Sequence, residues 1–149
     1  MHEAESAPAK ILVIEDNTAD VLLLRHALDH QGEAYELQVL QDGAQAMAFV
    51  ESQRTFSQEA APCVMVLDMH LPKHDGLSIL QALKRAPELL HIRVIALSSF
   101  VSPRDEEELR MLRVRLYREK PSDLDGWLAL AREIFTICRE PLESAASIA

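Results

Sequence analysis

The feature of this sequence that most constrains its fold is the apolar run at residues 64–67, which ends abruptly on Asp68. Consecutive apolar residues without alternating polar ones favour an inner strand of a parallel sheet, because helices cover such a strand on both faces. In sheets of this kind, functional groups lie at the carboxyl ends of the strands. Asp68 therefore stands where an α/β protein keeps a site, although an acidic residue at the end of one strand can also simply begin a turn.

Other segments show the same change from apolar to polar. Their apolar content predicts four further strands, at residues 11–14, 35–40, 94–97 and 116–117. The carboxyl ends of parallel strands share one edge of a sheet. We therefore expect a cluster of polar side chains at that edge, made of Glu15, Asp16, Asp68, Ser98 and Lys120.

Helical segments separate these strands. Asn17 is predicted to cap the first helix, with Asp20 completing a capping-box pattern, and Gly32 ends it. Further helices are expected to begin at residues 42–43, 75, 102 and 122, the last of them capped by Ser122 and ending at Pro141. Alternation at these lengths predicts an α/β fold, a doubly wound five-stranded parallel sheet with five helices on its two faces.

Composition excludes several classes of protein. With 149 residues, 48% of them hydrophobic, and no apolar stretch of about 18 residues, the chain fits one domain that does not span a membrane. Its net charge of −9 argues against nucleic acid or an anionic membrane surface as a partner, because both bind clustered Lys and Arg. Cys63 and Cys138 lie in apolar surroundings far apart in the sequence, which predicts reduced core residues of a cytoplasmic protein. The first ten residues lack the pattern of a signal peptide.

The expected cluster has a specific chemistry. Three carboxylates at one edge would repel one another unless a cation neutralised them. Oxygen ligands at an open site suit Mg²⁺, which keeps several waters and is commonly shared between carboxylates and a phosphate. A carboxylate that attacks phosphorus needs the charge on the transferring oxygens stabilised, which Lys120 and the cation can do with the Ser98 hydroxyl as a donor. The cluster therefore predicts transfer of a phosphoryl group to Asp68.

Four motifs, taken jointly and in this order, resemble the receiver domains of two-component response regulators, the CheY-like fold. They are I-L-V-I-E-D-N at 11–17, V-L-D-M-H-L-P-K-H-D-G at 66–76, A-L-S-S at 96–99 and Y-R-E-K-P at 117–121. The resemblance covers residues 9–139, which leaves residues 1–8 as a disordered lead and residues 140–149 as a C-terminal tail.

The resemblance implies a role for each acidic residue of the cluster. Asp68 would accept phosphate from a histidine kinase. Asp16 and Asp68 would bind Mg²⁺ together with the main-chain carbonyl of His70, and Glu15 would orient a metal-bound water. His70 departs from the usual pattern, since this position is often Asn, and its imidazole would alter autodephosphorylation.

The resemblance also implies a switch on the other side of Asp68. The Ser98 hydroxyl would move toward the phosphoryl oxygens, Tyr117 would turn inward with it, and Lys120 would contact the phosphoryl group. The bond between Lys120 and Pro121 would be a cis peptide, which prolyl bonds allow at modest cost. A glycine-alanine pair usual before the switch aromatic is replaced here by residues 114–116, which would stiffen that loop.

With no output domain after the last predicted helix, the expected protein is a stand-alone receiver that signals through protein contacts. It would be a signalling protein rather than an enzyme, promoting its own phosphorylation and slow autodephosphorylation. The wording of the first and second motifs resembles regulators paired with bacterial phytochrome kinases. A homodimer is also expected, because Leu142 and Ile148 place apolar side chains beyond the predicted core.

Three alternatives compete with this interpretation. A flavodoxin-like FMN carrier has the same topology, but its first loop must bind a phosphate, and the acidic residues at 15 and 16 would repel it. A haloacid-dehalogenase-type phosphatase needs a second Asp two residues after the nucleophile, where this chain has His70. A degenerate receiver that acts only as a scaffold is disfavoured by the joint presence of the acidic, hydroxyl and lysine residues.

Several residues have simpler interpretations. His26 and His30 lack the carboxylate of a zinc motif and are predicted to lie on the surface. Tyr117 could be a half-buried strand aromatic, but Lys120 three residues later favours the switch. The acidic run at residues 105–108 is expected to be a solvated helix start.

Overall fold

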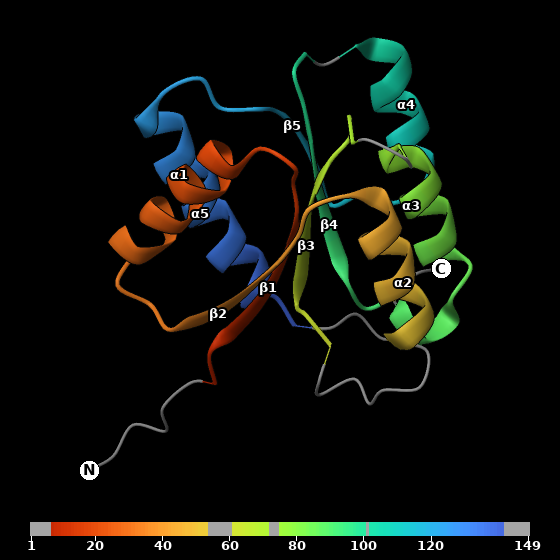
Figure 1. The fold of residues 1–149 in the computed structure, drawn as a ribbon, viewed down its shortest axis with the longest axis horizontal. Helices are drawn as coiled ribbons and strands as arrows, with labels where there is room; N and C mark the ends of the chain where they lie inside the picture. Colours follow the sequence, from red (N-terminus) through yellow and green to blue (C-terminus); the bar gives the residue numbers. More distant parts are fainter. Residues whose placement is uncertain (1–6, 54–60, 72–74, 101, 142–149) are drawn as a thin grey trace.

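The structure, a computed structural model, describes residues 7–53, 61–71, 75–100 and 102–141. Within these ranges the chain forms one parallel sheet with the strand order β2-β1-β3-β4-β5 (Figure 1). The strands are β1 (Ala9–Ile14), β2 (Tyr35–Leu40), β3 (Val64–Asp68), β4 (Arg93–Ser98) and β5 (Leu116–Glu119). The predicted doubly wound α/β fold is confirmed.

Helices cover both faces of this sheet. They are α1 (Thr18–His30), α2 (Gly43–Gln53), α3 (Gly76–Lys84), α4 (Pro103–Met111) and α5 (Leu124–Cys138), with a short 3-10 helix, η2 (Pro87–Leu89). Helices α1 and α5 lie on one face, and α2, α3 and α4 lie on the other (Figure 1). Helices α1 to α4 each return the chain to the side of the sheet where the strands begin, so the carboxyl ends of all five strands lie along one edge.

The apolar run that precedes Asp68 is buried on both faces. In the described part of the chain, the buried apolar side chains form two clusters on opposite sides of the sheet. Met65 and Leu67 belong to the cluster that includes α2 and α3, whereas Val64 and Val66 belong to the one that includes α1 and α5. Successive side chains of a strand point to opposite faces, so a strand between two helical layers needs an apolar residue at every position.

The helix caps match the sequence in three cases and differ in two. Asn17, Asp75 and Ser102 accept backbone N–H groups at the starts of α1, α3 and α4, as predicted. The prediction of a capping box at α1 is wrong, because the Asn17 N–H donates to Glu15 Oε2 at 3.1 Å instead of to the Asp20 carboxylate. The cap of α5 is Asp123 rather than Ser122, since Asp123 has the extended backbone of a cap and accepts the Gly126 N–H at 2.8 Å.

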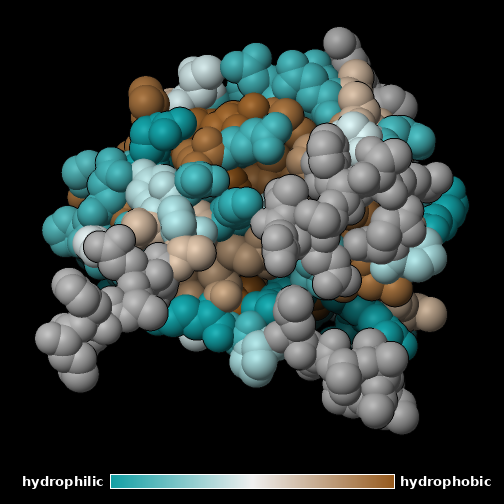
Figure 2. Space-filling model, turned by 90° about the horizontal axis from the view of Figure 1, so that it is seen from below, coloured by the Kyte–Doolittle hydropathy of each residue, from teal (hydrophilic) through white to brown (hydrophobic). Residues whose placement is uncertain are grey.

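The two cysteines form a disulfide, so the prediction of reduced core residues is wrong. Cys63 lies just before β3, and Cys138 is the last residue of α5, with 5.4 Å between their Cα atoms. Helix α5 runs antiparallel to the strand that it covers, and its end therefore reaches the edge of the sheet where β3 begins. Seen from that side, the molecule shows apolar residues in its middle with hydrophilic residues around them (Figure 2). The spacing of Cys63 and Cys138 in the sequence gives no sign that the two residues lie close together in space.

The remaining surface predictions concern helices α1 and α4. His26 and His30 are exposed on α1, as predicted, with ring centroids 6.5 Å apart. The acidic residues 105–108 are exposed at the start of α4. In the part of the chain that the structure describes, no helix is long and apolar enough to cross a bilayer.

Some sequence predictions concern residues outside the described ranges. They include most of the proposed lead at residues 1–8 and most of the tail at residues 140–149. Leu142 and Ile148, on which the homodimer was predicted, belong to that tail.

Candidate functional site

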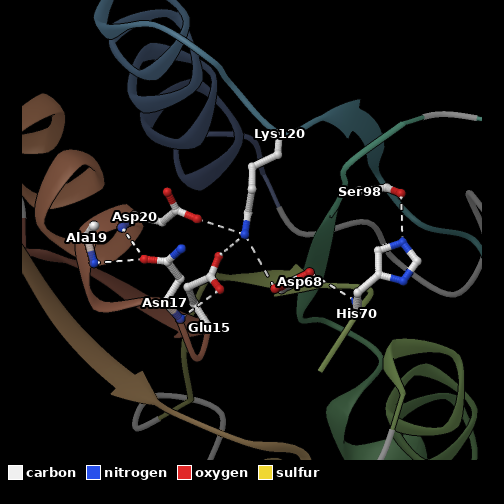
Figure 3. A network of polar contacts seen from close by, with 8 residues as sticks. All are labelled: Glu15, Asn17, Ala19, Asp20, Asp68, His70, Ser98 and Lys120. Carbon is white, nitrogen blue, oxygen red and sulfur yellow. Dashed lines mark hydrogen bonds and ion pairs between the residues drawn. The ribbon is translucent and has the colours of Figure 1, made fainter. Parts of the chain in front are cut away.

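The carboxyl edge of the sheet brings together the acidic residues expected there, and Figure 3 shows Glu15 and Asp68 among them. Glu15 and Asp16 follow β1, and Asp68 ends β3, which pairs with β1 in parallel register. One carboxylate oxygen from each of these residues lies within 4.8 Å of the others. Glu15 and Asp68 are buried, whereas Asp16 is exposed. Neighbouring parallel strands thus place three carboxylates from distant parts of the sequence at one point.

Lys120, just after β5, reaches into this group of carboxylates. Its Nζ lies 2.7 Å from Glu15 Oε1, 2.8 Å from Asp20 Oδ2 and 3.4 Å from Asp68 Oδ2. Burial by itself lowers the pKa of Lys120, but its hydrogen bonds to Asp20 and Glu15 outweigh burial and raise the pKa above its ordinary value. The ammonium group is therefore a permanent positive charge at the centre of the site.

The carboxyl group of Glu15 has a raised pKa. Burial raises the pKa of its carboxyl to about 7, although the hydrogen bonds from Lys120 and from the Asn17 N–H act in the opposite direction. The ammonium group of Lys120 therefore compensates the buried acidic charge only in part. More positive charge would stabilise the ionised form of Glu15.

The loop after β3 holds Asp68 in place. The His70 N–H donates to Asp68 Oδ1 at 2.9 Å, and the Gly76 N–H donates to the Met69 carbonyl at 3.2 Å. A Cβ atom on Gly76 would lie 2.8 Å from Met69 Cα, closer than real Cβ contacts allow. Glycine at the start of α3 therefore permits the helix to approach the backbone that follows Asp68.

Ser98 ends β4 and is buried, with 2% of its surface exposed. Its hydroxyl donates to the Phe100 carbonyl at 2.7 Å, and its Oγ lies 3.2 Å from His70 Nε2 (Figure 3). The Ser98 hydroxyl is thus occupied by these two partners. Tyr117, on β5, is half-buried and lines a pocket of about 220 Å³ together with His70 and Ser98.

The peptide bond before Pro121 is trans, so the predicted cis peptide is wrong. The small difference in free energy between the two prolyl isomers lets the surrounding chain select either one. In its trans form the segment still places Lys120 within hydrogen-bonding distance of Glu15.

Asp20 is the site residue that the sequence patterns missed. The capping-box pattern predicts only a role in the helix cap for Asp20, but its carboxylate pairs with Lys120 (Figure 3). Its place in the first turn of α1, directly after the acidic end of β1, points its side chain toward the carboxyl edge. An acidic residue in the first turn of the helix after a strand that ends in carboxylates is the signal that could have identified it.

The donor set fits a hard divalent cation. Carboxylate oxygens are the ligands that such ions prefer, and the oxygens of Glu15, Asp16 and Asp68 are close enough to share one ion. The raised pKa of Glu15 agrees with a site that lacks full charge compensation. Residues that could hold a metal and residues that could contact a phosphoryl group therefore lie together.

Comparison with known proteins gives matches over most of the chain. A model of the response regulator receiver domain matches residues 11–132. Response regulator Rcp1 from Synechocystis sp. is 33% identical over 134 residues, which cover 90% of this chain and 91% of Rcp1.

Two solved structures extend this likeness to three dimensions. The phosphorylated cyanobacterial phytochrome response regulator RcpA has a TM-score of 0.79 at 31% identity, covering 93% of this chain and all of RcpA. The Mn²⁺-bound form of Rcp1 has a TM-score of 0.77 at 31% identity, covering 92% of this chain and all of that chain. Sequence, fold and the acidic edge of the sheet lead to one conclusion: the chain belongs to the response regulator receiver family, whose members are signalling proteins that accept phosphoryl groups from histidine kinases.

Proposed function

We propose that Asp68 is the residue of this response regulator that accepts the phosphoryl group, in an Mg²⁺-dependent reaction, and that the chain then signals through contacts with other proteins. The observation that carries this proposal is the position of Asp68 at the end of the central strand β3. Its carboxylate lies 3.4 Å from the Lys120 ammonium and beside the carboxylates of Glu15 and Asp16. A nucleophile, a fixed positive charge and a set of metal ligands therefore meet at one point.

In the proposed reaction, a carboxylate oxygen of Asp68 forms a bond to phosphorus while the bond from phosphorus to the kinase histidine nitrogen breaks. That nitrogen keeps the electron pair. The His70 N–H holds Asp68 Oδ1 and so fixes the orientation of the carboxylate. Lys120 is close enough to exchange its contact with Asp68 for one with a phosphoryl oxygen.

Asp16 and Asp68, with the main-chain carbonyl of His70, would hold Mg²⁺, and Glu15 would orient a metal-bound water beside them. When bound, the ion would neutralise negative charge on the transferring oxygens. The positive charge of the ion would then lower the pKa of the buried Glu15 carboxyl, so that Glu15 would be ionised near neutral pH. Asp20 keeps a contact to Lys120 throughout, which holds the ammonium group over the site.

Ser98 and Tyr117 are proposed as the residues that respond to phosphorylation. Ser98 would exchange its present partners for a phosphoryl oxygen, and Tyr117 would turn toward the space beside it. The pocket of about 220 Å³ that both residues line leaves room for such a movement. The chain would promote its own phosphorylation and a slow autodephosphorylation.

The test is incubation with Mg²⁺ and acetyl phosphate, followed by measurement of the intact mass. We expect a phosphate-sized increment in the wild type, none in Asp68→Asn, and slower labelling in Asp16→Asn. Leu22→Ala is the matched control, because Leu22 is 65% exposed on α1 and has no place in the site. An unlabelled wild type, under conditions that label other receivers, would leave the scaffold alternative as the better description.

The kinase is proposed to be a phytochrome histidine kinase. RcpA is described as a cyanobacterial phytochrome response regulator, and it covers 93% of this chain at 31% identity. Phosphorylated phytochrome kinases and unrelated phosphorylated kinases should be mixed with the chain, and the rates of transfer compared. Equal rates from both groups would reject the pairing and would leave the role of Asp68 untouched.

Cytoplasmic location and homodimer formation are further proposals. A cytoplasmic receiver would meet the kinase domain that carries phosphohistidine. The homodimer would use Leu142 and Ile148, outside the described residues, as apolar contacts beyond the receiver at residues 9–139. Light scattering at micromolar concentration checks it, because a species of 16.7 kDa alone would exclude the dimer.

A further inference from the structure

We propose that the imidazole of His70 holds the hydroxyl of Ser98 away from Asp68, so that His70 must release Ser98 before Ser98 can contact a phosphoryl group. His70 would then be a positioning residue that sets how readily the protein changes state. This inference rests on the proposed roles of Asp68 and Ser98, and it goes beyond them by giving the His70 side chain a function of its own.

The hydrogen bonds of Ser98 assign the proton on His70. A serine hydroxyl has one proton, and that of Ser98 is donated to the Phe100 carbonyl at 2.7 Å. At its 3.2 Å contact with His70 Nε2, the Ser98 oxygen can therefore only accept. His70 must carry a proton on Nε2, and the contact is a hydrogen bond that the imidazole donates.

His70 contacts both parts of the proposed switch. Its backbone N–H donates to Asp68 Oδ1 at 2.9 Å, while its side chain reaches Ser98 (Figure 3). A change at the Asp68 carboxylate therefore acts directly on the residue that restrains Ser98. The connection runs through one residue, without a chain of intermediate contacts.

The surroundings allow the imidazole to leave. His70 is exposed, in contrast to Ser98, so its ring can rotate outward without a loss of core packing. His70 and Ser98 both line the pocket of about 220 Å³, and the acidic residues Asp75, Asp105 and Glu108 line the same pocket. They offer acceptors for the imidazole N–H once it has left Ser98. The restraint is thus one hydrogen bond of ordinary strength, which changes the balance between the restrained and released states by roughly three- to tenfold.

Three substitutions separate this role from simple packing. His70→Phe keeps a ring of similar size but has no N–H, and His70→Ala removes the ring. His70→Gln keeps an N–H donor on a flexible side chain and is the conservative rescue. Each variant is titrated with beryllofluoride, a phosphoryl analogue, in the presence of Mg²⁺, and the concentration that gives half-saturation is measured. The midpoint of urea unfolding is measured for the same variants, so that a change in binding can be told from a change in stability.

We expect His70→Phe and His70→Ala to bind the analogue three- to tenfold more tightly, and His70→Gln to stay within a factor of two of the wild type. In a Ser98→Ala background, the same change of His70 to Phe should have no further effect, because the restrained hydroxyl is absent. Tighter binding by all three variants, or an equal effect in the Ser98→Ala background, would overturn the proposal.

A measurement on the unphosphorylated protein keeps this inference separate from the proposed function. Nitrogen-15 NMR of the His70 ring should show Nε2 as the protonated nitrogen, with a resonance that shifts in Ser98→Ala. A neutral ring protonated on Nδ1 would overturn the restraint even if Asp68 is phosphorylated normally. Conversely, a wild type that takes up neither phosphate nor analogue refutes the proposed function, while the NMR result still decides whether His70 holds Ser98.

Discussion

Opening the disulfide between Cys63 and Cys138 should destabilise the folded chain by an amount that follows from its position. The bond closes a loop with a sequence separation of 75 residues. In the chain-entropy description, a loop of this length removes about 15 cal/mol/K from the unfolded state, which is about 4.5 kcal/mol of stability at 25 °C. With about 2.1 cal/mol/K of unfolding entropy per residue over 149 residues, the melting temperature should fall by roughly 14 °C.

The measurement is urea unfolding of three forms: the oxidised wild type, the wild type in a phosphine reductant, and the double variant Cys63→Ala with Cys138→Ala. Trp127 is the chain's tryptophan, is 3% exposed and packs in the same apolar cluster as Cys138, so its fluorescence reports unfolding. The reductant should not change the double variant. If the oxidised and reduced wild type differ by less than about 0.5 kcal/mol, the loop-entropy reasoning is refuted.

The same experiment bears on the proposed cytoplasmic location. Glutathione and thioredoxin systems keep most cytosolic thiols reduced. A protein that works there must therefore remain folded with the bond open. A reduced form that is largely unfolded at 37 °C would contradict the proposed location rather than the family.

Three further predictions follow from the packing. Leu80→Ala, at a fully buried position, should lower the free energy of unfolding by about 2–5 kcal/mol. The exposed control Leu22→Ala should change it by less than about 0.5 kcal/mol. Similar urea midpoints for the two variants would contradict the described core. Gly76→Ala should lower the free energy of unfolding by about 1–3 kcal/mol and slow labelling by acetyl phosphate, because the added Cβ would meet the backbone after β3. Unaltered stability and labelling would show that the close packing of α3 against this backbone does not require glycine. Burial, and then the hydrogen bond to Asp29, raises the pKa of Tyr35 to about 12, so its contribution to stability is complete below pH 10 and is lost as the pH rises through about 12. An absorbance titration should find this ionisation, and Asp29→Asn should lower its pKa; an identical curve for that variant would contradict the assignment.

Local patterns predicted most of the fold because each pattern has one local cause. The apolar run at β3 reflects burial on both faces, and the caps at Asn17, Asp75 and Ser102 reflect a side-chain oxygen next to free N–H groups. The sequence favours Ser122 over Asp123 without good reason, because both residue types are good caps and only the structure shows which side chain accepts a backbone N–H.

The features that could not be predicted depend on distances between remote segments. The disulfide requires the end of α5 to meet the start of β3, and the pairing of Asp20 with Lys120 requires the first turn of α1 to face the loop after β5. The motifs located the acidic residues of the site and the lysine, because the topology brings strand ends to one edge. They gave no access to the contact of His70 with Ser98, which depends on the rotamer of one side chain.

The division of the apolar side chains into two clusters also has a consequence for how such proteins diversify. Met65 and Leu67 are held by one helical layer, and Val64 and Val66 by the other. Mutations that reshape α1 and α5 can therefore accumulate without changing the packing of α2 and α3, with the sheet as a barrier between them. Because Asp68 ends the strand that both layers share, a change in one layer leaves in place the side chains by which the other layer holds this strand.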